Sequence, residues 1–388
     1  MIPLLLLRFD HVRRGAGTRT DNPVKLAILL PLVLASGLAP VRAQGHPAYG
    51  ICTSETAQPS VRKGSIPPIL PSLAMAWRDG FSRLRPDVAI DFPAPHGPPQ
   101  GALDPQLAAF LDGRLDFAFL TREIAEADLM RFRRTHRGAL PVVVPVAGGS
   151  WNRFGFVDPV VVIVHETNPL RAIDLRRLDG IFSSTRLRGG ADIIDWGAAG
   201  ARDWRGKPIH IVGGDAWAGE ESARALFMRR QVLSLPGNRG HWRIVSGSGD
   251  EADNVERVAR DPLAIGFTGF GHVLPGTRAL AIIPRPGSKP VAPTREAIAS
   301  RRYPFARTVD LLLARGADGC IDPMLAAFAS FIIGPEGQRI VTRQGVFLPL
   351  TRDQAMASRR LIAGDRANRS LDSTNMAIAM GTASGRRP

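Results

Sequence analysis

The sequence predicts an α/β protein in which strands and helices alternate along the chain. Short β-branched and aromatic runs bounded by Gly and Pro have the composition of buried strands, and the segments between them carry apolar residues at helical spacing. This alternation is typical of mostly parallel sheets with helices on both faces. In such sheets ligands bind at the carboxyl ends of strands and near helix N-termini, so residues just after strands are the candidate site residues.

The first predicted elements follow a turn-rich segment at 45–60. Residues 61–68 read as the end of a strand that runs into a Gly-Ser loop, and residues 87–94 alternate as a strand. Between them, residues 69–86 are predicted as a helix, with Pro71 near its first turn and apolar residues at helical spacing: Leu70, Leu73, Ala74, Trp77, Phe81 and Leu84.

The next predicted elements continue the alternation. Residues 104–115 are predicted as a helix that ends at Gly113, and residues 116–121 as a buried strand. Two β-branched strands then follow at 139–147 and 159–166.

Residues 1–43 are predicted to be a secretory signal peptide. Lys25 precedes a short apolar run that ends at Pro40, and "VRA" before Gln44 supplies a small-x-small cleavage site. The 24 residues ahead of this signal indicate that the true start lies downstream of Met1. No cysteine follows the apolar run at the cleavage point, so a lipoprotein anchor is not indicated. We expect a periplasmic protein that begins near Gln44.

The composition predicts a soluble globular protein. Removal of the signal leaves some 345 residues, which are enough for two lobes with their own cores. The formal charge of +15 falls to about +11 without residues 1–43 and favours anionic partners. No nucleic-acid module accompanies the charge, so nucleic acid is not an expected partner, and a coding bias towards Arg explains most of it. Cys52 and Cys320 allow a single disulfide in an oxidising compartment.

The chain carries no motif that indicates an enzyme or a cofactor site. Its eight His residues form no metal-ligand spacing, and neither a nucleophile elbow nor a P-loop is present. We therefore expect a protein that is not an enzyme and holds no metal or cofactor.

Five segments resemble the periplasmic phosphate-binding proteins that feed ABC transporters, and the resemblance covers roughly residues 60–350. In order, they are "VIVHETNPL" (162–170), "LDGIFSSTR" (178–186), "DPLAIGFTGFG" (261–271), "YPFAR" (303–307) and "GPEGQRIVTRQGVFLPL" (334–350).

The resemblance implies a two-lobed periplasmic-binding-protein fold with the ligand in a cleft between the lobes. The first lobe would hold residues 61–157 and 265–350, and the second lobe residues 158–264. An N-terminal segment at 44–60 would precede them. Residues 351–388 are expected to form a flexible basic tail, with one short helix around 352–362.

The same resemblance implies an anion site built from strand ends and helix N-termini, because a desolvated phosphate needs many hydrogen-bond donors. The Gly-Ser loop offers Ser65 and the N–H of Ile66. The stretch "FLTREIAEADL" places Thr121 and Arg122 at a strand end. Arg122 is expected to anchor the ligand or, alternatively, to form a structural ion pair, for instance with Glu220.

The remaining contacts are expected at Gly219 and Glu220, where the chain departs from the family pattern. Gly214 stands where the family has Arg, Ala218 where it has Ser, and Glu220 where it has Thr. Glu220 and Glu221 would occupy the positive end of a helix themselves. Pro-rich segments at 67–68 and 98–99 remove further backbone donors.

Two functions therefore remain open. One is a monomeric solute-binding protein that captures phosphate or another small oxyanion and delivers it to an ABC permease. The other is a degenerate homologue that acts as a periplasmic interaction or scaffold protein without a small ligand. Ser65, Thr121 and Arg122 favour the first, and the substitutions at Gly214, Ala218 and Glu220 favour the second.

Overall fold

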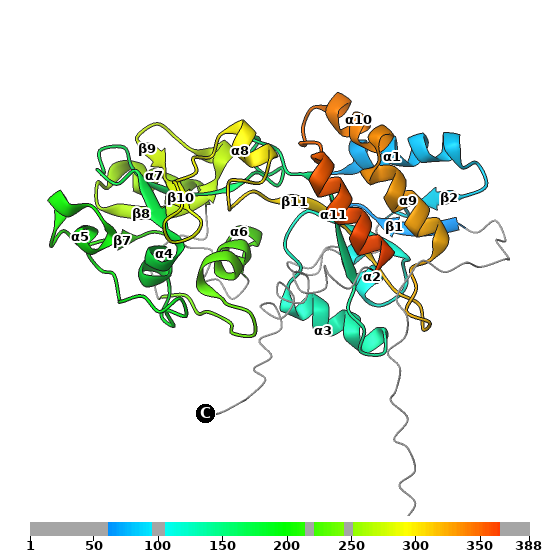
Figure 1. Cartoon of the computed structure of the whole chain (residues 1–388), viewed down its shortest axis with the longest axis horizontal. Helices are drawn as coiled ribbons and strands as arrows, with labels where there is room; N and C mark the ends of the chain where they lie inside the picture. The colour runs from blue at the N-terminus through cyan, green and yellow to red at the C-terminus, as the bar shows by residue number, and fades with distance from the viewer. Residues whose placement is uncertain (1–60, 95–104, 214–220, 244–250, 365–388) are drawn as a thin grey trace, which may run out of the picture. The chain divides into compact units, whose positions relative to one another are not determined.

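The computed structural model describes residues 61–94, 105–213, 221–243 and 251–364. It is an α/β structure with two main sheets, flanked by helices (Figure 1). We call the larger sheet with its helices the first lobe, and the smaller four-stranded sheet with its helices the second lobe. No helix within these ranges is both long enough and apolar enough to cross a membrane.

The first lobe is built on a five-stranded sheet of order β2-β1-β3-β11-β4. Its strands are β1 (Val61–Ser65), β2 (Ala89–Asp91), β3 (Phe117–Leu120), β4 (Val142–Gly148) and β11 (Thr308–Leu313). β1 pairs in parallel with β2 and β3, whereas β11 is antiparallel to both β3 and β4. The inserted antiparallel strand is β11, because this segment returns from the second lobe and enters the sheet from the opposite end.

Helices cover both faces of this sheet, as the burial of all of β3 requires, because successive side chains of a strand point to opposite faces. Phe117 and Phe119 face one core with α1 (Pro71–Leu84), α9 (Pro323–Ile333) and α10 (Pro335–Gln344). Ala118 and Leu120 face a smaller core with α2 (Pro105–Leu111) and α3 (Glu126–Thr135). The expected helices at 69–86 and 104–115 are thus present with shorter bounds.

The helix α11 (Arg352–Ala363) belongs to the first lobe. Thr351 caps it by accepting from the N–H of Gln354, and the hydroxyl of Ser358 donates to the carbonyl of Pro145 at 2.7 Å. Ile362 is buried in the same core as α9. The short helix expected around 352–362 is therefore present, and it is folded onto the first lobe rather than part of a flexible tail, because it is amphipathic and has apolar surface to bury. The rest of the expected tail lies outside the described residues.

The second lobe has a four-stranded sheet of order β7-β8-β5-β9 and a separate parallel pair, β10-β6. The bounds are β5 (Val160–His165), β6 (Ala172–Asp174), β7 (His210–Ile211), β8 (Ala264–Gly269), β9 (Thr277–Ala279) and β10 (Ala281–Ile283). Within this four-stranded sheet only β7 and β8 pair in parallel, whereas β5 is antiparallel to β8 and to β9. The expectation of a mostly parallel sheet is wrong here, because β8 runs back towards the start of β5.

The helices of this lobe pack on one continuous core. They are α4 (Leu175–Phe182), α5 (Trp196–Ala199), the 3-10 turns Arg202–Trp204 and Phe270–His272, α6 (Ala223–Met228), the π-helical turn η3 (Arg229–Leu233), α7 (Glu251–Arg260) and α8 (Arg295–Ala299). The core also includes Ile265, Leu280, Tyr303 and Phe305. Residues 265–305 therefore belong to the second lobe rather than to the first, since β8 pairs with β5.

The chain passes between the two sheets at neighbouring positions. Gly149 N–H donates to the carbonyl of Arg307 at 2.9 Å, and Val160 N–H donates to the carbonyl of Phe305 at 3.1 Å. Val157 lies in the outgoing passage, is buried, and has a left-handed φ of 57°. A Cβ at position 149 would lie 1.8 Å from the Val157 carbonyl oxygen, so only glycine fits there. The returning passage delivers Arg307 to the end of the first sheet.

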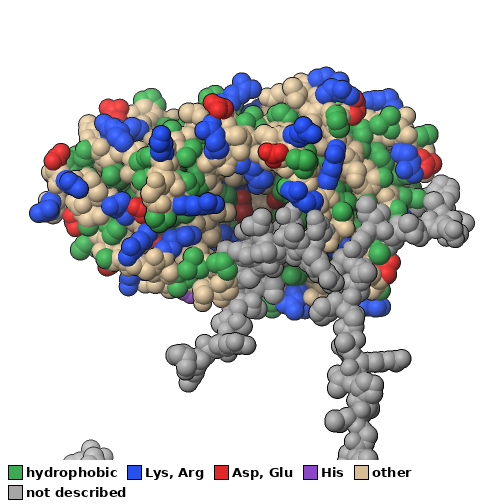
Figure 2. All heavy atoms as spheres, viewed as in Figure 1, with side chains coloured by type: hydrophobic (Ala, Val, Ile, Leu, Met, Phe, Trp, Pro, Cys, Tyr) green, Lys and Arg blue, Asp and Glu red, His purple; other side chains and the backbone are tan. Residues whose placement is uncertain are grey.

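Basic side chains are spread over the surface. In the view of Figure 2, Lys and Arg are distributed across the described part of the face rather than gathered into one patch. Many of the Arg side chains have a carboxylate partner nearby, as in the pairs of Arg85 with Asp87 and of Arg177 with Asp174. The excess positive charge therefore does not by itself mark a site.

Candidate functional site

The carboxyl ends of β1 and β3 lie side by side at one edge of the first sheet. The two strands are parallel neighbours, with Ser65 opposite Ala118. Ser65 and Ile66 therefore come to the same edge as Thr121 and Arg122. Such an edge is where open α/β sheets bind their ligands.

The first expected contact is already satisfied within the protein. The Ile66 N–H donates to Oε1 of Gln106 at 3.1 Å, and Nε2 of that side chain donates to the carbonyl of Pro93 at 2.8 Å. Ser65 is buried. The Gly64 before it is needed for packing, because a Cβ there would lie 2.2 Å from the Phe117 ring. Sequence reasoning missed Gln106, whose position at the start of α2 was the available signal.

Arg122 is held by a carboxylate of its own lobe. Its Nη1 lies 2.6 Å from Oδ2 of Asp128, its Nη2 lies 3.1 Å from Oδ1, and Nη1 also donates to the carbonyl of Glu123 at 2.8 Å. Asp128 additionally accepts from the Ala125 N–H at 2.7 Å and so caps α3. The structural ion pair weighed for Arg122 is present, but its partner is Asp128; Glu220 lies outside the described residues.

The residues after Arg122 attract further arginines from elsewhere in the chain. Arg307 donates from Nε and Nη2 to the two carboxylate oxygens of Glu123, each at 3.0 Å. The antiparallel register of Asp310 with Leu120 continues along the chain to bring Glu123 opposite Arg307. In the sequence they stand 184 positions apart, so single-sequence reasoning gave no signal for this pair.

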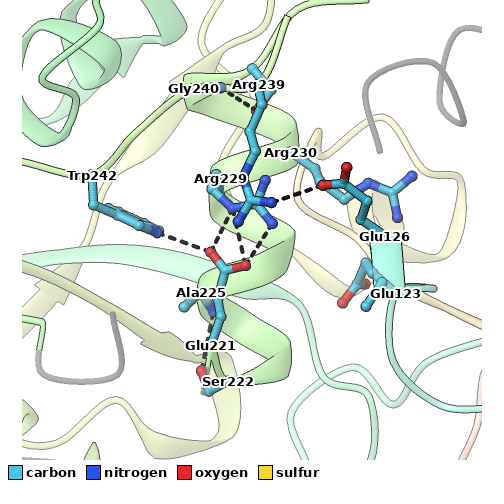
Figure 3. A network of polar contacts seen from close by, with 12 residues as sticks. Glu123, Glu126, Glu221, Ser222, Ala225, Arg229, Arg230, Arg239, Gly240 and Trp242 are labelled. Atoms are coloured by element: carbon cyan, nitrogen blue, oxygen red, sulfur yellow. Dashed lines mark hydrogen bonds and ion pairs between the residues drawn. The ribbon is translucent and has the colours of Figure 1, made fainter. Parts of the chain in front are cut away.

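Two arginines of the second lobe reach the same segment (Figure 3). Arg230 in η3 donates to the carbonyl of Ile124 at 2.9 Å, and Arg239 pairs with Glu126 at 2.8 Å. Residues 122–126 therefore carry one arginine and receive three more. We call the three arginines Arg122, Arg230 and Arg307, together with Glu123, the arginine cluster.

Asp310 on β11 adds a carboxyl to the surroundings of this cluster. Its Oδ1 is shielded from solvent and has no hydrogen-bond partner within the described part of the chain. Burial raises the pKa of Asp310 to about 6, although the Thr308 hydroxyl and the charges of Arg301 and Arg230 act in the opposite direction. Burial likewise lowers the pKa of the Arg230 guanidinium. The charges of Arg301 and Arg230 therefore reach the Asp310 carboxyl.

Glu221 does not occupy the positive end of α6. Ser222 caps that helix, and the Glu221 carboxylate accepts from Nε and Nη2 of Arg229, at 2.7 and 2.6 Å, and from Nε1 of Trp242 at 3.0 Å (Figure 3). The expectation for Glu221 is thus corrected, because a buried guanidinium eight positions further on is a stronger partner than the helix end. Gly214, Ala218, Gly219 and Glu220 lie outside the described residues.

The arrangement provides the groups that an oxyanion requires. Guanidinium groups offer paired N–H donors to two oxygens of one anion, and the strand ends supply a hydroxyl at Thr121. Among the described residues, no three His, Cys, Asp or Glu side chains are grouped as metal ligands. The guanidinium and hydroxyl groups here are donors of the kind from which anions accept hydrogen bonds.

Comparison with known proteins identifies the family of the chain. The profile of the PBP superfamily domain matches residues 105–336. The phosphate-binding protein PstS of Pseudomonas aeruginosa is 26% identical over 286 residues, which cover 72% of this chain and 80% of that protein.

Two solved structures are also similar to this chain. An ABC-type phosphate transport receptor from Vibrio cholerae is 15% identical, with a TM-score of 0.47, over 75% of this chain and 100% of that one. PstS from Borrelia burgdorferi is also 15% identical, with a TM-score of 0.47, over 75% and 99%. The sequence of this chain is similar to that of a phosphate-binding protein. The domain profile matches more than half of this chain, so the chain belongs to the PBP superfamily.

Proposed function

We propose that this protein is a periplasmic solute-binding protein that captures phosphate, or an oxyanion like it, and delivers it to an ABC permease. The observation that carries the proposal is the meeting of the β1 and β3 ends, which brings Thr121 and Arg122 to one sheet edge. The similarity to proteins named for phosphate binding supports the same ligand class. It does not favour the alternative of a scaffold without a ligand.

In this proposal Arg122 is the anchoring cation. Its pairing with Asp128 fixes the guanidinium at the end of β3, and its exposed fraction of 24% against 3% for Asp128 leaves it the accessible member of the pair. A guanidinium has five N–H donors, so Arg122 retains donors for an anion while bound to Asp128. Gly219 and Glu220 are proposed as further contacts to the anion.

The test is titration calorimetry of the protein purified after secretion, with phosphate at low salt, then with sulfate and small carboxylates. We expect phosphate binding that is lost in Arg122→Ala. Arg131→Ala is the matched control, because Arg131 forms a similar two-bond pair with Asp112, at 2.6 and 2.8 Å, on the adjoining helix. No heat and no thermal stabilisation with any of these anions would refute the proposal.

Secretion is tested on the same material. The proposal expects an N-terminus near Gln44 after export, and recovery of the protein as a monomer from the periplasmic fraction. An uncleaved chain that remains in the cytoplasm would contradict the assigned location.

A further inference from the structure

The Glu123–Arg307 pair and the Arg122–Asp128 pair differ in which of the two partners is buried. Arg307 is the buried member, with 4% of its side chain exposed against 17% for Glu123, and it also lies over the Phe227 ring. In the Arg122–Asp128 pair the carboxylate is the buried member. Arg307 is therefore a preorganised cation, and Glu123 is the partner with access to solvent.

The geometry of the pair is one that an oxyanion reproduces. Nε and Nη2 of Arg307 each donate to a different oxygen of the Glu123 carboxylate at 3.0 Å. Two oxygens of a phosphate or sulfate present the same face to a guanidinium. Glu123 thus holds the place that an anion would take on Arg307.

The charges around the pair favour an anion there. Arg230 and Arg301 act on the same buried carboxyl, Asp310, that Glu123 also influences. The guanidinium groups of Arg307, Arg230 and Arg301 thus stand against the two carboxyl groups of Glu123 and Asp310, and burial further disfavours the ionised form of Asp310. Loss of the Glu123 charge would leave the buried guanidinium of Arg307 without its counter-charge.

We propose that Glu123 is a built-in competitor of the ligand: its carboxylate occupies Arg307 and so limits the affinity of the site for tetrahedral oxyanions. This inference rests on the proposed function and adds its regulation. Binding of an anion at Arg307 requires Glu123 to turn towards solvent, which its exposure permits. The resting protein keeps its buried arginine neutralised while no ligand is present.

The decisive variant is Glu123→Gln, which keeps the shape of the side chain and removes its charge. We expect phosphate to bind about tenfold more tightly than to the unaltered protein, which corresponds to ~1.4 kcal/mol. Glu126→Gln is the control: it removes a charge from the same segment, but that charge pairs with the exposed Arg239. The control should stay within about twofold of the unaltered protein.

A second variant shows whether the gain passes through Arg307. Glu123→Gln combined with Arg307→Met should lose the gain, because the freed guanidinium is gone. If Glu123→Gln is too unstable for calorimetry, its melting temperature is measured in phosphate and in chloride at equal ionic strength. A larger rise in phosphate than the unaltered protein shows then supports the inference, and an equal or smaller rise overturns it.

The outcomes separate this inference from the proposed function. Phosphate binding by the unaltered protein with no gain in Glu123→Gln overturns the inference and leaves the function in place. Binding by the variant alone supports the inference and makes the unaltered site a blocked one. No binding by either protein overturns both. Sulfate is titrated in parallel, and an equal gain for it is expected because Glu123 opposes any tetrahedral anion.

Discussion

The guanidinium of Arg122 is fixed at the end of β3 by both carboxylate oxygens of Asp128, at 2.6 and 3.1 Å. Asp128 is nearly inaccessible, with 3% of its side chain exposed, and it caps α3 through the Ala125 N–H as well. One carboxylate therefore performs two tasks. It orients the proposed anion anchor, and it holds the first turn of the helix that follows the strand.

We expect Asp128→Ala to lower the free energy of unfolding by about 3 kcal/mol. The change leaves Arg122 without its counter-charge and removes the helix cap, and breaking a buried pair typically costs 3–5 kcal/mol. Asp112→Ala is the comparison, since Asp112 is more exposed and its pair with Arg131 should contribute about 1 kcal/mol or less. Urea unfolding of both variants measures the difference, and equal losses would contradict the role given to Asp128.

The Glu221–Arg229–Trp242 contacts are expected to stabilise the second lobe independently of any ligand. Glu221→Ala leaves the buried Arg229 unpaired and removes the acceptor for Nε1 of Trp242, so we expect a loss of about 2–4 kcal/mol. Glu256→Ala is the control, because the Glu256–Arg260 pair on α7 is exposed and should contribute less than about 0.5 kcal/mol.

Thermal unfolding, followed by tryptophan fluorescence, measures this prediction. A Glu221→Ala melting temperature equal to that of Glu256→Ala would show that the Glu221 contacts are not a source of stability.

Local pattern predicted the early strands and helices of the first lobe well, but not α3, α9 or β11. β3 and α1 follow from an apolar run and from helical spacing, and each occurs within two residues of its expected bounds. Arg122 could be placed at a sheet edge because the rule on strand ends needs only the strand itself. The partner of Arg122 could not be predicted, because Asp128 has the same local pattern as any acidic residue in the first turn of a helix.

Contacts between distant segments account for what the sequence did not reveal. β8 is buried throughout, so its pattern does not tell which sheet it joins, and residues 265–305 were expected in the wrong lobe. Arg307 lies in the segment 303–307, which resembles the family. Its partner Glu123 stands 184 positions earlier, and the chain forms the second lobe between them. A single sequence carries no information on such pairing.

The start of α10 is tightly packed against the end of α9, which makes Gly337 sensitive to substitution. A Cβ there would lie 2.2 Å from the Ile332 carbonyl oxygen and 2.5 Å from that of Phe331, and the Gly337 carbonyl accepts from the buried Nε1 of Trp77 at 3.0 Å. We expect Gly337→Ala to cost roughly 1–3 kcal/mol, because backbone atoms must move.

Gly213→Ala is the matched control for this substitution. Among the described residues its added Cβ would meet only the Phe267 ring, at 3.4 Å, so a change within about 0.5 kcal/mol is expected. Urea unfolding measures both. Equal effects would mean that the junction of α9 and α10 relaxes without cost.

Asp310 should make the protein more stable at mildly acidic pH than at neutral pH. Its pKa is raised from 3.8 to about 6 by burial, so between these values the folded state binds a proton that the unfolded state has released. Stability from this group is therefore greatest at low pH and falls as pH rises from about 4 through 6. Above that, the ionised carboxylate costs on the order of 3 kcal/mol.

Asp310→Asn isolates this contribution, because it keeps the shape and removes the titration. We expect the variant to be more stable than the unaltered protein at pH 7.5, and the advantage to shrink as the pH is lowered to 5. The comparison of the two proteins cancels every other titrating group, including the histidines.

The charges that face Asp310 come from Arg301, Arg230 and Glu123. Because Glu123 raises the Asp310 pKa, Glu123→Gln should move the midpoint of the effect to lower pH. Urea unfolding at a series of pH values measures these changes, and a variant that is destabilised equally at pH 5 and 7.5 would show that Asp310 remains ionised in the folded protein.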